Sequence, residues 1–333
     1  MTKIKVGVLT GGPSSEHFVS LSSGKQVAHG LDKNKYEVYP VLITKKNKWL
    51  IKSYQWIENI KDIHQNVNKD VKSETCAINI EPVIQKIKEM DVIFICLHGE
   101  FGEDGRVQAL LDLLKVPYTG SGVLASAIGL DKASFKRYFS GIVTMPKSYV
   151  IERGKVIGSP KIAGKLVVKP SDQGSSVGVS VVSSNSDYIK AVKKVFEFCD
   201  RVIVEEYIAG TEVSCGVLGN SNPFALEVVE IKPKSKFFDY KSKYLPGEAK
   251  EIIPARINKS LTTQVKNIAI TIHKTLGCKG FSRADMIVND KGIFVLEINT
   301  IPGLTPNSLL PKEASATGIS YSELLDIIIS NAF

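Results

Sequence analysis

The sequence predicts two to three domains that combine α/β and α+β folds. A chain of 333 residues is longer than most single domains. A β-prone run over 3–10 is followed by the turn Gly11-Gly12 and a helical pattern over 16–31, which is how an α/β unit begins. Further along, strands over 147–151, 166–170 and 201–206 with a helix over 187–198 indicate an α+β unit.

The composition is typical of a soluble globular protein, with 43% hydrophobic and 23% charged residues. The N-terminus lacks the apolar core of a signal peptide, and no apolar run approaches a membrane span, so we expect a cytoplasmic protein with no membrane association. The five scattered cysteines contain no C-x-x-C and indicate neither a zinc site nor a disulfide framework. The net charge is +9, but the basic residues are dispersed among acidic ones and form no surface that combines aromatic and basic side chains. This pattern argues against nucleic-acid binding, whereas a basic bias is compatible with binding an anionic nucleotide.

The N-terminal α/β part continues with a strand over 37–43, an irregular stretch over 45–80, a helix over 82–90, a strand over 91–97 and a helix over 106–115. Ligand sites in such folds lie at the carboxyl ends of the strands. Glu16 follows the first strand, where it either contacts a ligand or only interacts with the helix dipole. The motif H-G-E-F-G-E-D-G, which begins at His98, follows another buried strand and is expected to be functional rather than an idle loop.

A glycine-rich segment is the main feature of the central part. Pro117-Tyr118-Thr119-Gly120-Ser121-Gly122 resembles a domain boundary, and the helix after it contains Asp131-Lys132. The run 171–182, which follows Lys169, lacks the G-K-[S/T] ending of a phosphate loop and passes into β-branched residues. We interpret it as a hairpin flap whose N–H groups fold over phosphates, with a plain glycine-containing hairpin as the alternative.

The C-terminal part begins with two strands that end near Ile231. The lysine-rich stretch 232–254 has poor periodicity and is the best candidate for a mobile lid, unless it is only a solvated loop. An amphipathic helix over 259–276 leads into two β-prone runs, and a helix over 321–330 closes the chain.

The two β-prone runs around N-D-K-G predict a hairpin within residues 280–303. A three-residue loop over 290–292, with Asn289 opposite Ile293, places Asp285 opposite Glu297 and Arg283 opposite Asn299. All four then share one face, and the apolar residues Ala284, Met286, Val288, Phe294, Leu296 and Ile298 share the other.

A cation is expected at the polar face of this hairpin, because directly opposed carboxylates repel each other without a counter-ion. Two carboxylates and an amide oxygen form a hard ligand set, for which Mg²⁺ is the first choice. The alternative is a solvated face with exposed charges.

Five motifs in this sequence resemble those of the D-alanine–D-alanine ligase family of the ATP-grasp superfamily: H-G-E-F-G-E-D-G-R-V-Q, V-K-P-S-D-Q-G-S-S-V-G, F-D-Y-K-S-K-Y, G-F-S-R-A-D and L-E-I-N-T-I-P-G-L-T-P-N-S-L. They occur in family order from Gly11 to Leu310, so the resemblance covers essentially the whole chain. It implies a three-domain ATP-grasp architecture with an N-terminal Rossmann-like parallel sheet in residues 1–120, a central subdomain with the flap in 121–206 and a C-terminal subdomain with the lid in 207–333.

The resemblance also implies a reaction: ATP-dependent joining of two D-alanines through a D-alanyl phosphate, for peptidoglycan precursor synthesis. It implies ATP and two Mg²⁺ ions as cofactors, with Mn²⁺ as an alternative ion, and a homodimer. Tyr244 resembles the tyrosine of family members that make the D-alanyl-D-alanine dipeptide, which favours an amine acceptor. The flap residues Asp172-Gln173 and the lid sequence after Tyr244 are positions without a firm family pattern.

Site residues implied by the resemblance fall into four groups. The catalytic group is Glu16, Ser175, Tyr244, Arg283, Gly303 and Ser308, in which Arg283 and the Gly303 N–H stabilise the tetrahedral oxyanion. The substrate-binding residues are His98 and Leu309. The nucleotide-binding residues are Lys132, Lys169, Ser176, Glu205, Glu206, Ile208, Glu212 and Lys243. The metal ligands are Asp285, Glu297 and Asn299.

Three alternative functions remain open from the sequence. One is an ATP-grasp ligase with another acceptor, such as D-lactate. A second is a nucleotide-binding module without catalysis, which would require one of the charged positions to be missing, and none is. The third is a dinucleotide oxidoreductase, which is disfavoured because the Gly11-Gly12 turn is not a G-x-G-x-x-G.

Overall fold

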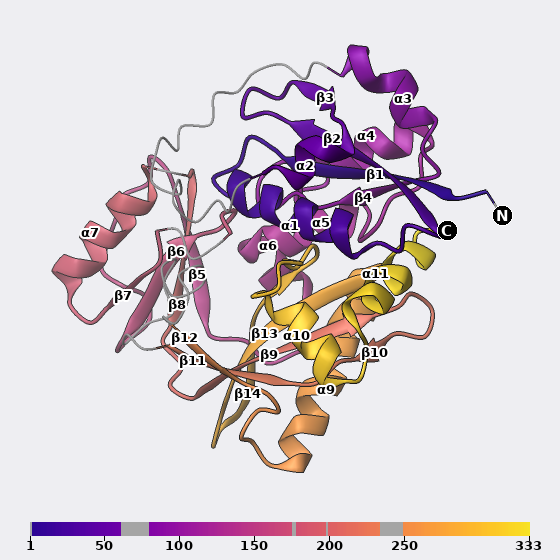
Figure 1. Ribbon diagram of the computed structural model, residues 1–333. Coiled ribbons are helices and arrows are strands. Elements are labelled where there is room, and N and C mark those ends of the chain that lie inside the picture. Colours follow the sequence, from indigo (N-terminus) through magenta and orange to yellow (C-terminus); the bar gives the residue numbers. More distant parts are fainter. Residues whose placement is uncertain (1, 61–79, 175–177, 198, 234–248) are drawn as a thin grey trace.

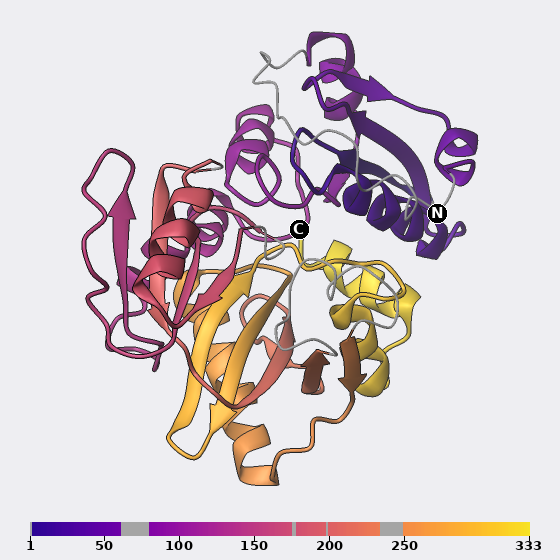
Figure 2. The same cartoon turned by 90° about the vertical axis from the view of Figure 1, so that its left-hand side faces the viewer.

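The computed structural model describes residues 2–60, 80–174, 178–197, 199–233 and 249–333. Within these residues the strands form three sheets, each in its own lobe (Figure 1). The predicted combination of parallel α/β and antiparallel α+β structure is confirmed. Figure 2 shows the N-terminal lobe facing the C-terminal helices, with the central lobe beside both.

The N-terminal sheet has the order β3-β2-β1-β4. Its strands β1 (Ile4–Gly11), β2 (Tyr36–Ile43) and β4 (Val92–Ile95) are parallel, and the edge strand β3 (Trp49–Ile51) is antiparallel. The helical segments of this lobe are α1 (His17–Gly30), α2 (Tyr54–Glu58), η2 (Glu81–Val83), α3 (Ile84–Lys88) and α4 (Arg106–Leu114).

The prediction of an irregular stretch over 45–80 is wrong for β3 and α2. Trp49 is fully buried, and Ser53 caps α2 by accepting a hydrogen bond from the Trp56 N–H. Both elements are shorter than the windows in which periodicity can be recognised. Residues 61–79 lie outside the described part of the chain.

The central sheet has the order β5-β8-β6-β7, and each pair is antiparallel. Its strands are β5 (Ser148–Glu152), β6 (Leu166–Pro170), β7 (Ser180–Val182) and β8 (Arg201–Glu206). Helix α7 (Asn185–Val195) packs on β6 and β7, and it begins two residues earlier than predicted because Ser184 serves as its N-cap. The helices α5 (Val123–Leu130) and α6 (Lys132–Tyr138) precede the sheet.

The C-terminal sheet has the order β12-β11-β9-β13-β14, and the short strand β10 (Phe224–Ala225) also pairs with β9. Its other strands are β9 (Thr211–Leu218), β11 (Val229–Pro233), β12 (Ala249–Ile252), β13 (Phe281–Asn289) and β14 (Gly292–Asn299). Helix α9 (Lys259–Leu276) packs on the apolar face of this sheet, to which Ala284 and Met286 of β13 belong. Helix α10 (Leu309–Ala316), which the sequence did not predict, contacts β9.

The hairpin β13–β14 confirms the predicted pairs Asp285–Glu297 and Arg283–Asn299, but the predicted turn is wrong. Asn289 pairs with Gly292, so the loop has two residues rather than three. A bulge between Asp285 and Met286 leaves Leu296 without a partner and restores the register. As a consequence Ile293 and Val295 are buried in place of Phe294 and Leu296, because a one-residue shift exchanges the two faces of a strand.

The N-terminal and C-terminal lobes share one hydrophobic core. Helix α11 (Tyr321–Ser330) contacts α1, and its Leu325 belongs to the same buried cluster as Val8 of β1. At the rim Asp326 accepts hydrogen bonds from Lys35 Nζ at 2.6 Å and from the Tyr36 hydroxyl at 2.8 Å. Ile301 and Leu304 of the loop between β14 and α10 belong to the same cluster, so this loop is held against the N-terminal sheet. Among the helices described, none has the length and apolar character needed to cross a bilayer.

Candidate active site

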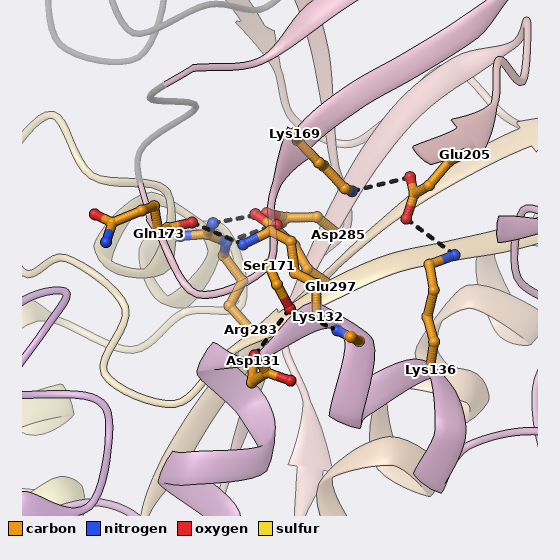
Figure 3. A network of polar contacts seen from close by, with 11 residues as sticks. Asp131, Lys132, Lys136, Lys169, Ser171, Gln173, Glu205, Arg283, Asp285 and Glu297 are labelled. Carbon is orange, nitrogen blue, oxygen red and sulfur yellow. Dashed lines mark hydrogen bonds and ion pairs between the residues drawn. The ribbon is translucent and has the colours of Figure 1, made fainter. Parts of the chain in front are cut away.

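The two carboxylates on the polar face of the hairpin are paired with cationic side chains: Asp285 with Arg283, and Glu297 with Lys132 (Figure 3). Arg283 donates to Asp285 from Nε at 3.1 Å and from Nη2 at 2.9 Å, and the Ser214 hydroxyl donates to the same carboxylate at 2.6 Å. The Lys132 ammonium lies 3.4 Å from Glu297 Oε2. The expected repulsion between opposed carboxylates is therefore offset by an arginine and a lysine in this structure.

Lys132 joins this face to the start of the flap. Helix α6 begins at Lys132 because Asp131 Oδ1 accepts from the Ser134 N–H at 2.8 Å. The Lys132 ammonium donates to the Gln173 carbonyl at 2.9 Å. Asp131 Oδ2 in turn accepts from the Ser171 hydroxyl at 2.8 Å, so the helix start and the first flap residues form one unit.

A buried ion triad lies beside this unit. Glu205 of β8 is 2% exposed and lies 2.9 Å from the ammonium of Lys169 and 3.1 Å from that of Lys136. Although burial opposes ionisation, the two lysines lower the pKa of Glu205. Burial lowers the pKa of Lys136, whereas Glu205 and Glu297 raise that of Lys169 against the effect of burial. Lys169 is therefore held as a cation close to the acidic hairpin.

The donor set of the hairpin face fits a hard metal ion only in part. In the described ranges no group of three or more His, Cys, Asp or Glu side chains could hold a metal. Asp285, Glu297 and the amide of Asn299 are two carboxylates and one amide oxygen, which is the kind of incomplete oxygen set that Mg²⁺ uses when phosphates and water complete its shell. The Asn299 amide oxygen accepts from the Ile301 N–H at 3.1 Å.

Glu16 lies between the N-terminal lobe and the flap. Its carboxylate is 6% exposed and is so close to two glycines that a Cβ would be 2.7 Å from Oε2 at Gly99 and 2.8 Å at Gly174. Any side chain at either position would displace the carboxylate. The glycines of two sequence motifs thus form the pocket that holds Glu16, with Gly99 at a φ of +69°.

His98 connects the N-terminal lobe to the loop that follows β14. Its Nε2 lies 2.9 Å from the Ser23 hydroxyl and its Nδ1 lies 3.1 Å from the Ile301 carbonyl. Burial lowers the pKa of His98, so the ring is neutral, with Nδ1–H donating to the carbonyl and Nε2 accepting from Ser23. Both ring nitrogens of this predicted substrate-binding residue are engaged by the protein.

Glu103 is a neighbouring residue to which the sequence assigned no role. Its carboxylate accepts from the Gly99 N–H at 2.6 Å and more distantly from the Ile301 N–H at 3.4 Å. Burial, and then the charge of Glu16, raise the pKa of Glu103 to about 8. His98 and Glu103 therefore hold the carbonyl and the N–H of Ile301, two residues before Gly303.

Gly303 and Ser308 lie together at the start of α10. A Cβ at Gly303 would be 2.7 Å from Ser308 Oγ, and that hydroxyl accepts from the Thr305 N–H at 3.1 Å. Helix α10 begins at Leu309 directly after Ser308. The structure therefore brings these predicted residues to the end of the acidic hairpin.

The remaining predicted residues divide into two groups. Around the strand end of β8, Glu206 Oε1 accepts from the Lys147 N–H at 2.8 Å, and Ile208 and Glu212 are half-buried. Ser175, Ser176, Lys243 and Tyr244 lie outside the described residues, as does most of the predicted lid.

Two residues of the charge network were missed although the sequence carries a signal for each. Lys136 lies one helical turn after Lys132, so the two side chains share a face of α6. Ser214 lies directly opposite Asp285 in the pairing of β9 with β13. The spacing of Lys136 is apparent within its own helix, whereas the position of Ser214 follows only when the pairing of β9 with β13 is known.

Glu313 of α10 had no such signal. It is fully buried, and neither of its carboxyl oxygens completes a hydrogen bond within the described residues, although Gly216 and Ser214 are close by. Burial raises its pKa to about 8. Although burial has the opposite effect, Asp285 and then Glu313 raise the pKa of Arg283.

Comparison with known proteins identifies ligases that resemble this chain in sequence and in fold. The family description "D-ala D-ala ligase N-terminus" matches residues 5–121, and "D-ala D-ala ligase C-terminus" matches residues 127–330. The chain is 38% identical to a D-alanine–D-alanine ligase of Syntrophotalea carbinolica, covering 98% of this chain and 96% of the relative. It is also 38% identical to one of Bacillus cytotoxicus, covering 99% and 95%.

Solved structures agree with this assignment. The VanG D-Ala:D-Ser ligase from Enterococcus faecalis has a TM-score of 0.81 at 32% identity and covers 100% of both chains. The D-alanine–D-alanine ligase from Bacillus anthracis complexed with ATP has a TM-score of 0.78 at 31% identity, covering 99% of this chain and 97% of that one. The ATP-grasp architecture implied by the motifs is thus confirmed, and this chain belongs to the D-alanine–D-alanine ligase family.

Proposed function

We propose that this protein joins two D-alanines to D-alanyl-D-alanine with hydrolysis of ATP to ADP and phosphate. Family membership supports the overall reaction. The observation that carries the proposal is the convergence of Lys132 and Lys169 with the carboxylates of Asp285 and Glu297. Lysines beside opposed carboxylates suit a polyphosphate that binds together with a divalent cation.

ATP would bind between the central and C-terminal sheets. Lys132 and Lys169 would hold its phosphates, and the N–H groups of the flap would fold over them. Glu205, Glu206 and Ile208 would line the adenine pocket, with Glu212 on the ribose, and Ser176 and Lys243 would complete the phosphate contacts. A relative of known structure has been described in complex with ATP, which supports this use of the site.

Asp285, Glu297 and Asn299 would hold Mg²⁺, or Mn²⁺ in its place. The ion would supply neutralisation of the phosphate charge. For this the protein must release the two carboxylates from their present partners. The Lys132 ammonium lies at 3.4 Å from Glu297 and can turn to a phosphate without leaving the site. Arg283 must likewise give up at least part of its bidentate contact with Asp285.

The first D-alanine would bind near Glu16. The carboxylate of Glu16, which lies against Gly99 and Gly174, would hold the ammonium group of this substrate. The substrate carboxylate would then attack the γ-phosphorus and displace ADP to form an acyl phosphate, for which correct positioning supplies most of the rate enhancement. Ser175 and Tyr244 would join Glu16 in closing the site.

The second D-alanine would bind at the start of α10, with its carboxylate held by Ser308 and Leu309. Its amine would attack the acyl phosphate carbonyl. Arg283 and the Gly303 N–H would stabilise the oxyanion that forms, and phosphate would leave. His98 and Glu103 hold Ile301 and thereby position Gly303 for this step.

Cellular context and assembly form part of the same proposal. The dipeptide would serve peptidoglycan precursor synthesis in the cytoplasm, and the protein would act as a homodimer. Residues 1–120, 121–206 and 207–333 would be its three domains. These statements extend the family resemblance and are tested separately from the reaction.

The test is a coupled assay of ADP release with D-alanine as the first substrate and D-alanine, D-serine or D-lactate as the acceptor. We expect D-alanine to be preferred, with a rate that rises with pH as the acceptor amine loses its proton. D-serine is included because one structural relative is a D-Ala:D-Ser ligase. Turnover with D-lactate that equals or exceeds turnover with D-alanine at neutral pH would contradict the proposed acceptor.

A further inference from the structure

Glu313 is a buried acid for which the reaction described above has no use. Its side chain is 0% exposed, and neither carboxyl oxygen has a hydrogen-bond partner within the described residues. It lies over Gly216 of β9, where a Cβ would be only 2.5 Å from Glu313 Oε2. The absence of a side chain at Gly216 is thus what gives this carboxyl its place against the sheet.

The position over Gly216 puts Glu313 beside Arg283. In the pairing of β9 with β13, Gly216 lies directly opposite Arg283, and Ser214 lies opposite Asp285. Directly paired residues of neighbouring strands project to the same face. Arg283 is 9% exposed and is buried close to two acids: Asp285, which it contacts through two hydrogen bonds, and Glu313, which raises its pKa. The carboxyl oxygens of Glu313 complete no hydrogen bond among the described residues, although the Gly216 N–H and the Ser214 hydroxyl are near.

Asp285 cannot keep its two hydrogen bonds from Arg283 while it also coordinates a divalent cation. Its Oδ1 accepts from Arg283 Nε and from the Ser214 hydroxyl, and its Oδ2 accepts from Arg283 Nη2. A cation on this carboxylate would compete for the same lone pairs and would repel the guanidinium. A buried arginine that loses its counter-ion is strongly unfavourable unless a second acid replaces the first.

We propose that Glu313 is this second acid: when Asp285 binds a divalent cation, Arg283 transfers hydrogen bonds from Asp285 to Glu313. Glu313 is then a positioning residue that acts through Arg283. It keeps the guanidinium paired and in the site, and it leaves Asp285 available to the metal. The inference depends on the metal-binding role proposed for Asp285.

The test is calorimetric titration of Mn²⁺ into the full-length protein saturated with ADP, which requires no turnover. Glu313→Gln retains the size of the side chain and removes its ability to ionise. Glu227→Gln is the matched control, because Glu227 pairs with Lys266 and lies outside the site. Each substitution is made in the wild-type protein and in an Arg283→Met background, and thermal unfolding verifies that each variant is folded.

We expect Glu313→Gln to weaken Mn²⁺ binding about tenfold in the wild-type protein, which corresponds to the difference between a charged and a neutral hydrogen-bond partner. In the Arg283→Met background it should have no effect, because Asp285 then has no guanidinium to release. Glu227→Gln should bind Mn²⁺ like the wild type in both backgrounds.

The inference is overturned if Glu313→Gln binds Mn²⁺ like the control, or if it weakens binding equally in both backgrounds. Should Glu313→Gln fail to fold, Glu313→Met removes the acid without leaving a polar group unpaired, and the same two criteria apply to it. Failure of the proposed function would look different: the Arg283-dependent effect on Mn²⁺ would be present, while D-alanine would produce no ADP.

Discussion

The ion triad around Glu205 gives the sharpest prediction for stability. Replacing Glu205 by Gln keeps the shape of the side chain but removes the charge that the ammonium groups of Lys169 and Lys136 share at 2.9 and 3.1 Å. All three side chains are nearly inaccessible to water. The variant therefore leaves two cations buried without an acid within contact distance of both.

The expected loss follows from the cost of breaking a buried ion pair, which is about 3–5 kcal/mol. The lower end applies here for two reasons. The Gln carbonyl can still accept one hydrogen bond from a lysine. Burial already lowers the pKa of Lys136, so this lysine releases its proton more easily than an exposed one. We therefore expect Glu205→Gln to lower the free energy of unfolding by about 3 kcal/mol, or the melting temperature by about 6–12 °C.

The assay is thermal and urea unfolding without nucleotide at pH 7.5, monitored by circular dichroism. Glu206→Gln is the control, since it makes the same chemical change at the next residue of β8, where the more exposed side chain accepts from the Lys147 N–H. The free energy of unfolding of the control should fall by less than about 1 kcal/mol. Equal destabilisation of the two variants would refute the reasoning that the triad is held by charge.

Three further predictions concern substrate binding, pH and helix capping. Gly174→Ala should raise the KM for D-alanine about tenfold through displacement of the Glu16 carboxylate; an unaltered KM would show that Glu16 does not hold the substrate ammonium. Burial lowers the pKa of His273 from 6.5 to about 4, so its contribution to stability is complete above about pH 6.5 and is lost as the pH falls toward 4. Urea unfolding should therefore show about 2 kcal/mol less stability at pH 5 than at pH 7, and a His273→Gln variant should lack this component; an identical pH dependence in both proteins would rule it out. Ser320→Ala removes the capping box of α11 and should cost about 1 kcal/mol in urea unfolding, whereas a change below the error of the measurement would mean that packing against α1 alone fixes this helix.

Local chemistry made several elements predictable from sequence. Helix α9 has the predicted bounds because Asn258 caps its start and Gly277 ends it in the left-handed conformation. The pairs Asp285–Glu297 and Arg283–Asn299 followed from the two-residue period of strands. The contact of Lys132 with Glu297 joins distant elements, and only the phosphate-binding and metal-binding roles implied by the family motifs pointed to it.

Other features depend on tertiary packing and could not be predicted. The turn and the bulge of the hairpin both differ from the predicted register, yet the two deviations compensate before Asp285 is reached. Helix α10 was not predicted, and its Pro311 lies in the first turn, where proline is tolerated. With α10 missed, Glu313 could not be placed over Gly216, and its burial could not be foreseen.

We propose that the acidic face of the hairpin serves a D-alanine-dependent reaction of ATP. The most direct measurement is ADP release by the wild type and by Glu297→Gln, with D-alanine and Mg²⁺ added singly and together. The wild type should release ADP only when both are present, and the variant should be slower by about a hundredfold or more, because it lacks a charge that the phosphates and their cation require. Phosphate release that is independent of D-alanine and equal in the two proteins would contradict the claim.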